Sequence, residues 1–243
     1  MKKILIFLVL VLYACAGKNW MAPNDFVYVP IKTDNYEIAT WQKIENPTNN
    51  HIHIYIEGDG YAFNAYGQPT SNPTPHGTFM RDLATHDNFD NVVYVARPCQ
   101  FIMSDACSEN DWTTGRFSQR IIDAQSRAIK QIAKNKKITL IGYSGGALVS
   151  GLIIEQHPEL NIEKWITIAG VLNHEKWTTY FGDAPLTESV NLEQLPNVNQ
   201  LHFVGGKDSV VPYELAKTWA NEKDIKIIPN AEHTNFGNLN LFK

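Results

Sequence analysis

Residues 138–149 read Ile-Thr-Leu-Ile-Gly-Tyr-Ser-Gly-Gly-Ala-Leu-Val, and this stretch decides how the rest of the chain is interpreted. A β-prone apolar run ends at Gly142, and a run of small and apolar residues begins after Gly146. The first run is typical of a buried strand and the second of a helix. Ser144 supplies the one aliphatic hydroxyl of the Gly-x-Ser-x-Gly sequence between them. The stretch therefore predicts a tight strand-to-helix turn with an exposed serine.

The two outer glycines of this turn match the pattern of a nucleophile elbow. Gly142 and Gly146 lack the Cβ atoms that would collide around a strained serine. A helix that starts near Gly145 would direct its N–H groups toward an oxyanion formed over Ser144. A phosphate-binding loop is disfavoured, because neither Gly-x-x-x-x-Gly-Lys-Ser/Thr nor Gly-x-Gly-x-x-Gly occurs. A plain close-packed turn is the other alternative.

The N-terminus has the pattern of an export signal. Residues 1–3 (Met-Lys-Lys) are basic, and residues 4–12 form an apolar run that is short for a membrane span. Residues 14–16 (Ala-Cys-Ala) fit ordinary cleavage, whereas residues 12–15 (Leu-Tyr-Ala-Cys) resemble a bacterial lipobox. We favour the lipobox, with Cys15 acylated, because ordinary cleavage needs no cysteine. The protein is then expected outside the cytoplasm, either periplasmic and tethered to the outer-membrane surface by lipid or, without acylation, secreted.

Export leaves Cys99 and Cys107 as an even pair in an oxidising compartment. We expect a disulfide between them, with two buried free thiols as the alternative. Their spacing fits neither Cys-x-x-Cys redox chemistry nor a zinc site with a second ligand pair. The formal net charge of −4 argues against a general nucleic-acid binder and indicates no charged partner.

Beyond the signal segment 1–16, residues 17–243 have the pattern of one α/β domain, a usual size for such a domain. Three long irregular stretches, 58–75, 97–115 and 171–196, each follow a predicted strand, where the sites of such sheets lie. The third is expected to form a small cap. Alternation of strands and helices predicts a mainly parallel sheet covered by helices on both faces. The expected strands are 25–31, 36–42, 52–56, 91–96, 138–142, 165–169, 200–204 and 224–228, and the expected helices are 78–87, 117–135, 146–157 and 212–221.

A serine nucleophile needs a general base and a carboxylate that orients the base. In elbow folds the acid and then the histidine follow the serine along the chain. Asp208 comes just after a predicted strand that ends in glycines, and His233 lies on a polar loop after the last strand. Asp208 could instead cap a helix, and His233 could be an ordinary solvated residue. The competing acids are Glu175, Asp183 and Glu214, and the competing histidines are His157, His174 and His202.

An oxyanion formed at such a serine needs two N–H donors. Gly145, the residue after the serine, would supply one. Asp59 or Gly60 would supply the other, from the glycine-rich turn 57–60 (Glu-Gly-Asp-Gly). An ordinary glycine turn is the alternative. The acidic pair Glu57 and Asp59 lacks the companion ligands of a calcium loop, so we expect no metal site.

Together these motifs resemble those of the α/β-hydrolase superfamily, in that family's chain order and over nearly all of residues 17–243. Within it, the chain is similar to a group of bacterial secreted or lipoprotein α/β-hydrolases of undefined substrate. That similarity rests on residues 57–60, 96–100, 112–113, 116–118 and 205–206. Many relatives carry histidine where this chain has Glu57. The resemblance implies an eight-stranded, mostly parallel sheet with helices on both faces, with Ser144 as nucleophile, His233 as base and Asp208 as its orienting carboxylate.

The resemblance also implies a serine hydrolase that forms an acyl-enzyme and uses no cofactor. No long apolar lid is evident, which favours carboxylic esters with short or medium acyl chains, including lipid-like esters. We expect the loop 97–115 to form one wall of the site. Trp177, Tyr180 and Phe181 of the cap would contact substrate or simply pack. The alternatives are a peptidase or thioesterase with the same triad, and a non-catalytic binding lipoprotein of the same fold.

Overall fold

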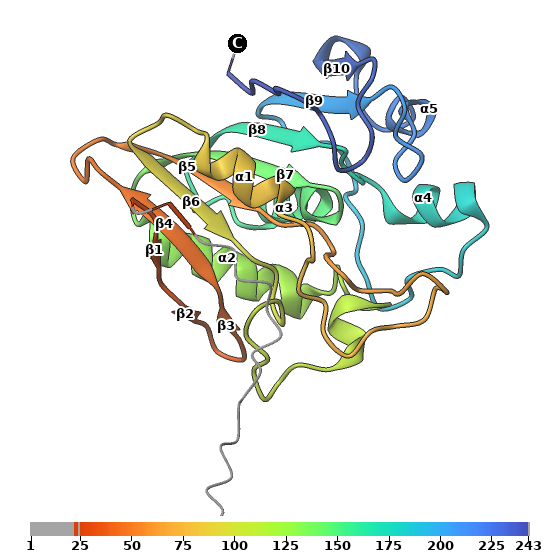
Figure 1. Cartoon of the computed structure of the whole chain (residues 1–243), viewed down its shortest axis with the longest axis horizontal. Coiled ribbons are helices and arrows are strands. Elements are labelled where there is room, and N and C mark those ends of the chain that lie inside the picture. The colour runs from red at the N-terminus through yellow and green to blue at the C-terminus, as the bar shows by residue number, and fades with distance from the viewer. Residues whose placement is uncertain (1–21, 24, 243) are drawn as a thin grey trace, which may run out of the picture.

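The computed structural model describes residues 22, 23 and 25–242 (Figure 1). The predicted signal segment 1–16, with Cys15, lies outside the described residues. Within the described residues, no helix has the length and apolar character needed to cross a bilayer.

The centre of the molecule is an eight-stranded sheet, as the resemblance implied, with the order β1-β4-β6-β5-β7-β8-β9-β10. All neighbours from β6 to β10 pair in parallel. The two antiparallel pairings are those of β1 with β4 and of β4 with β6. In sequence order the strands are β1 (Val27–Tyr28), β4 (Thr40–Ile44), β5 (His51–Ile56), β6 (Asn91–Val95), β7 (Lys137–Tyr143), β8 (Ile162–Ile168), β9 (Asn199–Gly205) and β10 (Ile225–Ile228). A separate pair, β2 (Ile31–Lys32) and β3 (Glu37–Ile38), lies beside it.

Helices cover both faces of this sheet (Figure 1). Apolar side chains of α2 (Gln119–Ala133) and α3 (Gly145–Gln156) pack in one core cluster. Side chains of α1 (Phe79–Thr85) and of the C-terminal segment, including Phe236, pack in a second cluster on the other face. The amphipathic pattern predicted for α2 is confirmed, because its apolar residues are buried. The remaining helices are α4 (His174–Phe181), α5 (Tyr213–Ala216) and two 3₁₀ turns, η1 (Glu109–Trp112) and η2 (Glu222–Asp224).

Three elements differ from the expectation. The first hairpin is split between two sheets, and Pro30, which lacks an N–H, lies at the break. The predicted helix 212–221 shortens to α5, after which Thr218 and Trp219 continue in tight i→i−3 turns. Segment 171–196 was expected to be irregular but contains α4. Asn173 caps the start of α4 through the Lys176 N–H, and Gly182, at φ 70°, ends it.

Buried His202 in β9 predicts a pH-dependent stability. Burial lowers its pKa to about 4, below the ordinary value of 6.5. Between these two pH values, His202 is protonated in the unfolded chain but neutral in the folded one. Its contribution to stability is therefore complete above pH 6.5 and is lost as the pH falls toward 4. The loss amounts to about 3 kcal/mol.

Urea unfolding of the wild type and of His202→Gln at neutral and mildly acidic pH measures this contribution. The variant is expected to show a smaller acid-induced loss of unfolding free energy than the wild type. Equal losses in the two proteins would contradict the assignment to His202. His202 bonds the Thr167 hydroxyl through Nδ1 at 2.8 Å and faces Gln200 through Nε2, so the variant's overall stability is compared at both pH values.

Candidate active site

Ser144 lies at the sharp turn between β7 and α3, where its backbone has φ 51° and ψ −122°. Residues other than glycine rarely adopt such a positive φ, and a backbone strained in this way persists only where surrounding contacts hold it in place. Here the Ser144 N–H donates to Ile168 O at 3.0 Å, and the Ser144 carbonyl accepts from the N–H groups of Ala147 and Val171, each at 3.1 Å. The predicted elbow is therefore present and is held on three sides.

The two outer glycines of the elbow are required by close backbone contacts. A Cβ on Gly142 would lie 2.5 Å from Gly146 O, and a Cβ on Gly146 would lie 2.4 Å from Glu57 O. The second contact joins the elbow to the turn after β5. No side chain fits at either position unless the backbone moves, so both positions require glycine.

The structure brings together the three residues predicted to form the triad. His233 Nε2 lies 3.0 Å from Ser144 Oγ, and His233 Nδ1 lies 2.9 Å from Asp208 Oδ2. The Asp208 carboxylate is fully buried, and its other oxygen accepts from the N–H groups of Val210 and Val211 at 2.8 Å each. Those two bonds fix the carboxylate. With Nδ1 donating to Asp208, His233 has Nε2 free to accept the Ser144 proton.

The competing residues have other surroundings. His202 bonds Thr167 within the sheet, and His157 faces Asp123 and Glu159 at the end of α3. His174 is buried at the start of α4, with its ring stacked on Phe117.

One contact of His233 could not be predicted from the sequence. The Tyr143 hydroxyl donates to the His233 carbonyl at 3.1 Å, and this bond connects the loop that carries His233 to the elbow.

The predicted oxyanion donors lie on two adjacent segments. Gly145 is the first residue of α3, so its N–H has no partner within the helix. The turn 57–60 lies against the elbow, because a Cβ on Gly58 would be 3.1 Å from Ser144 Cβ. The Gly58 N–H is already bonded to Glu57 Oε1. The N–H groups of Asp59 and Gly60 make no hydrogen bond within the described part of the chain.

Glu57 holds this turn together from within. Its carboxyl group is buried and accepts from the Tyr94 hydroxyl at 2.7 Å and from the Gly58 N–H at 3.0 Å. Burial raises the pKa of Glu57, and the two hydrogen bonds oppose that rise. The side chain thus holds the backbone of the turn from below.

A cleft of about 1020 Å³ opens at Ser144 and His233. Asp59, Gly60 and Tyr61 line it, together with residues 75–80, 82 and 83 at and before α1 and residues 234 and 237–240 after His233. The expectation that the loop 97–115 forms a wall was wrong, because no residue of that loop lines this cleft. Sequence reasoning missed the α1 and C-terminal walls, since neither carries a chemical motif.

Of segment 171–196, which the sequence predicts to form a cap, Val171 and Trp177 reach the cleft. The Trp177 indole N–H donates to Val210 O at 2.8 Å, which holds the ring at the cleft edge. Tyr180 and Phe181 are exposed on α4 and do not line the cleft. Of the three aromatic residues singled out in this segment, only Trp177 is placed to meet a substrate.

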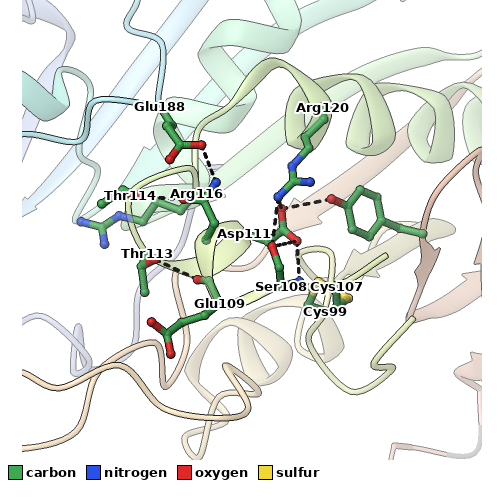
Figure 2. A network of polar contacts seen from close by, with 12 residues as sticks. Cys99, Cys107, Ser108, Glu109, Asp111, Thr113, Thr114, Arg116, Arg120 and Glu188 are labelled. Atoms are coloured by element: carbon green, nitrogen blue, oxygen red, sulfur yellow. Dashed lines mark hydrogen bonds and ion pairs between the residues drawn. A yellow bond between two sulfur atoms is a disulfide. The ribbon is translucent and has the colours of Figure 1, made fainter. Parts of the chain in front are cut away.

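The loop 97–115 is instead held in place by a disulfide and a network of polar contacts (Figure 2). The structure joins Cys99 and Cys107 by a disulfide. Beside the disulfide, the buried Asp111 carboxylate accepts from the Tyr36 hydroxyl at 3.1 Å and from the Ser108 N–H at 2.9 Å, and pairs with Arg120. These contacts connect the loop to β3's hairpin and to α2.

Loss of this disulfide is expected to lower the free energy of unfolding by about 2–3 kcal/mol, because the crosslink restricts a short loop of the unfolded chain. Chemical unfolding of the wild type and of the Cys99→Ser/Cys107→Ser variant measures the difference. Reductant should destabilise the wild type by the same amount and leave the variant unchanged. An equal effect of reductant on both proteins would show that the crosslink contributes nothing.

Comparison with known proteins now decides the family. The family model described as Serine hydrolase (FSH1) matches residues 98–233, which is 136 of the 243 residues. The chain belongs to this serine hydrolase family. The matched region contains Ser144, Asp208 and His233, whereas Asp59 and its turn lie before it. No curated protein matches the chain by sequence.

Solved structures share the fold, among them an α/β serine hydrolase and an esterase. XC6422 from Xanthomonas campestris, described as lacking a lid, is 14% identical, with 87% of each chain covered and a TM-score of 0.53. The Pyrococcus furiosus esterase PF2001 is 16% identical over 86% of this chain and 82% of its own, with a TM-score of 0.58. Est1E from Butyrivibrio proteoclasticus is 15% identical over 86% and 90%, with a TM-score of 0.56. This serine hydrolase therefore has the α/β-hydrolase fold.

Proposed function

We propose that this serine hydrolase cleaves carboxylic esters of short or medium acyl length through an acyl-enzyme on Ser144. The observation that carries the proposal is the continuous hydrogen-bonded series from Asp208 through His233 to Ser144 at the floor of an open cleft. Nucleophile, base and orienting carboxylate supply the chemistry from the chain's own residues.

The proposed reaction begins when Ser144 Oγ attacks the ester carbonyl and His233 Nε2 takes its proton. The developing oxyanion faces the Gly145 N–H and the N–H of Asp59 or Gly60. His233 then returns the proton to the leaving alcohol. Water attacks the acyl-enzyme with His233 again as base, which releases the acid and restores Ser144. Asp208 keeps the Nδ1 proton in place and stabilises the imidazolium.

The cleft architecture supports the preference for shorter acyl chains. α4 has only eight residues, and Trp177 is its one residue that lines the cleft. Among the described residues, the cleft lining mixes apolar side chains such as Phe79, Leu83 and Leu239 with polar ones such as Thr78 and Asn238, and we take this mixture to suit a shorter acyl chain. The solved structure from Pyrococcus furiosus that is described as an esterase supports the same class of bond.

Nitrophenyl esters of increasing acyl length test the proposal. We expect kcat/KM to be highest for butyrate or octanoate and to fall for palmitate. Butyryl anilide and a butyryl thioester serve as matched substrates for the peptidase and thioesterase alternatives, and both should be cleaved more slowly than the butyrate ester. Faster cleavage of either would transfer the assignment to that class, and no hydrolysis of any substrate would favour a binding protein.

A further inference from the structure

The Asp59 carboxylate is held between two buried arginines. Asp59 Oδ1 lies 3.2 Å from an Nη of Arg97, and Oδ2 lies 3.2 Å from Nε of Arg116. The two arginine side chains are only 5% and 6% exposed, whereas that of Asp59 is 25% exposed and faces the cleft. Such enclosed pairs have a fixed geometry, and removal of one partner leaves the others without compensation.

The same arginines are fixed by contacts to the turn and to each other. An Nη of Arg97 donates to the Arg116 carbonyl, and the Arg97 N–H donates to Gln100 Oε1 at 3.0 Å. Gln100 Nε2 in turn donates to Gly58 O at 2.9 Å. Two residues of loop 97–115 therefore bind the turn 57–60. Gln100 binds its backbone, and Arg97 binds the Asp59 side chain.

The Asp59 side chain also touches the other source of oxyanion donors. A Cβ on Gly145 would lie only 2.0 Å from Asp59 Oδ1, so the carboxylate lies directly against the Gly145 Cα. One edge of this group contacts the first residue of α3, and its oxygens pair with Arg97 and Arg116. The side chain thus sets the spacing between the turn 57–60 and the start of α3.

We propose that the Asp59 side chain, clamped by Arg97 and Arg116, is a positioning residue that holds the two N–H donors of the oxyanion hole at their working separation. The inference rests on the proposed function of Ser144 and adds a role for the carboxylate to the backbone role predicted for Asp59. The two guanidinium groups offset the negative charge of the Asp59 carboxylate. They therefore reduce its repulsion of an oxyanion that develops beside it.

Asp59→Asn tests this role, because asparagine keeps the size of the side chain but carries no negative charge to pair with the two arginines. The matched control is Asp111→Asn, which removes another buried carboxylate paired with an arginine, here Arg120 (Figure 2). Active sites are first counted by fluorophosphonate titration, so that kcat is expressed per reactive serine. The ligand for the tetrahedral state is an arylboronic acid.

We expect Asp59→Asn to lower kcat for nitrophenyl butyrate by about 10- to 100-fold, less than the loss of a whole oxyanion donor. KM should stay unchanged, and the boronic acid should bind more weakly by a similar factor. Asp111→Asn should lose thermal stability but retain its kcat per site. A purely structural role for Asp59 would lower the melting temperature and the count of active sites without changing kcat per site.

An Asp59→Asn enzyme with unchanged kcat and unchanged boronic acid affinity would overturn the proposal. If this variant does not fold, Arg116→Lys gives the same test, since lysine keeps the charge but removes the guanidinium group that pairs with Asp59 Oδ2. It should lower kcat with KM unchanged, and wild-type kcat would overturn the proposal. Failure of the proposed function itself is distinguishable, because the wild type would then neither hydrolyse the ester nor be titrated.

Discussion

Ser144→Ala is expected to lower kcat for ester hydrolysis by about 10⁵- to 10⁶-fold, because the nucleophile and the histidine that activates it act as one unit. The fold should remain intact, since the Ser144 backbone bonds to Ile168, Ala147 and Val171 do not involve the side chain. Steady-state kinetics with nitrophenyl butyrate and thermal unfolding measure the two effects.

Ser126→Ala is a suitable control for this variant. Its hydroxyl makes only a local bond to the Asp123 carbonyl on α2, so its kcat should equal that of the wild type. Retention of substantial activity by Ser144→Ala would mean that another group attacks the ester. An equal loss in both serine variants would indicate that the loss comes from folding.

Asp208→Asn is expected to lower kcat by about 10⁴-fold with little effect on KM. The carboxylate accepts the His233 Nδ1 proton and, through its other oxygen, the N–H groups of Val210 and Val211. An asparagine that keeps its oxygen on the two N–H groups must direct its amide N–H toward His233. The imidazole then carries its proton on Nε2, where it cannot accept from Ser144.

Asp87→Asn provides a control with the same chemistry elsewhere in the molecule. Asp87 Oδ2 lies 2.7 Å from Nδ1 of His53, near the start of β5 and outside the cleft lining. Its replacement should lower stability and leave kcat unchanged. Equal kcat losses for the two aspartate variants would contradict the assignment of Asp208 as the carboxylate that orients the base.

The sheet and the elbow could be predicted from the sequence because their causes are local. Gly142 and Gly146 are imposed by backbone contacts under 3 Å, and α2 is specified by its apolar periodicity. The errors came where tertiary context or a single residue prevails. Pro30 lies where the first hairpin divides between two sheets. Helix α4 begins after the Asn173 cap and ends at Gly182, and both residues are typical signals of helix ends.

The order serine, acid, histidine allowed Ser144, Asp208 and His233 to be named together, because this fold fixes which loops meet. The clamp on Asp59 could not be derived in that way. Arg97 and Arg116 are far from Asp59 in sequence, and no periodicity predicts a contact between side chains of separate loops. The same limit explains the wrong prediction for loop 97–115. The sequence placed this loop beside the substrate, whereas Arg97 and Gln100 of the loop contact the turn 57–60.

The most direct test of the central claim is the site of covalent labelling by a fluorophosphonate, located by peptide mass spectrometry. The account predicts one adduct per chain, on the peptide that contains Ser144, with no adduct in Ser144→Ala and much slower labelling in His233→Ala. An unlabelled wild type, or an adduct that persists in Ser144→Ala, would contradict it.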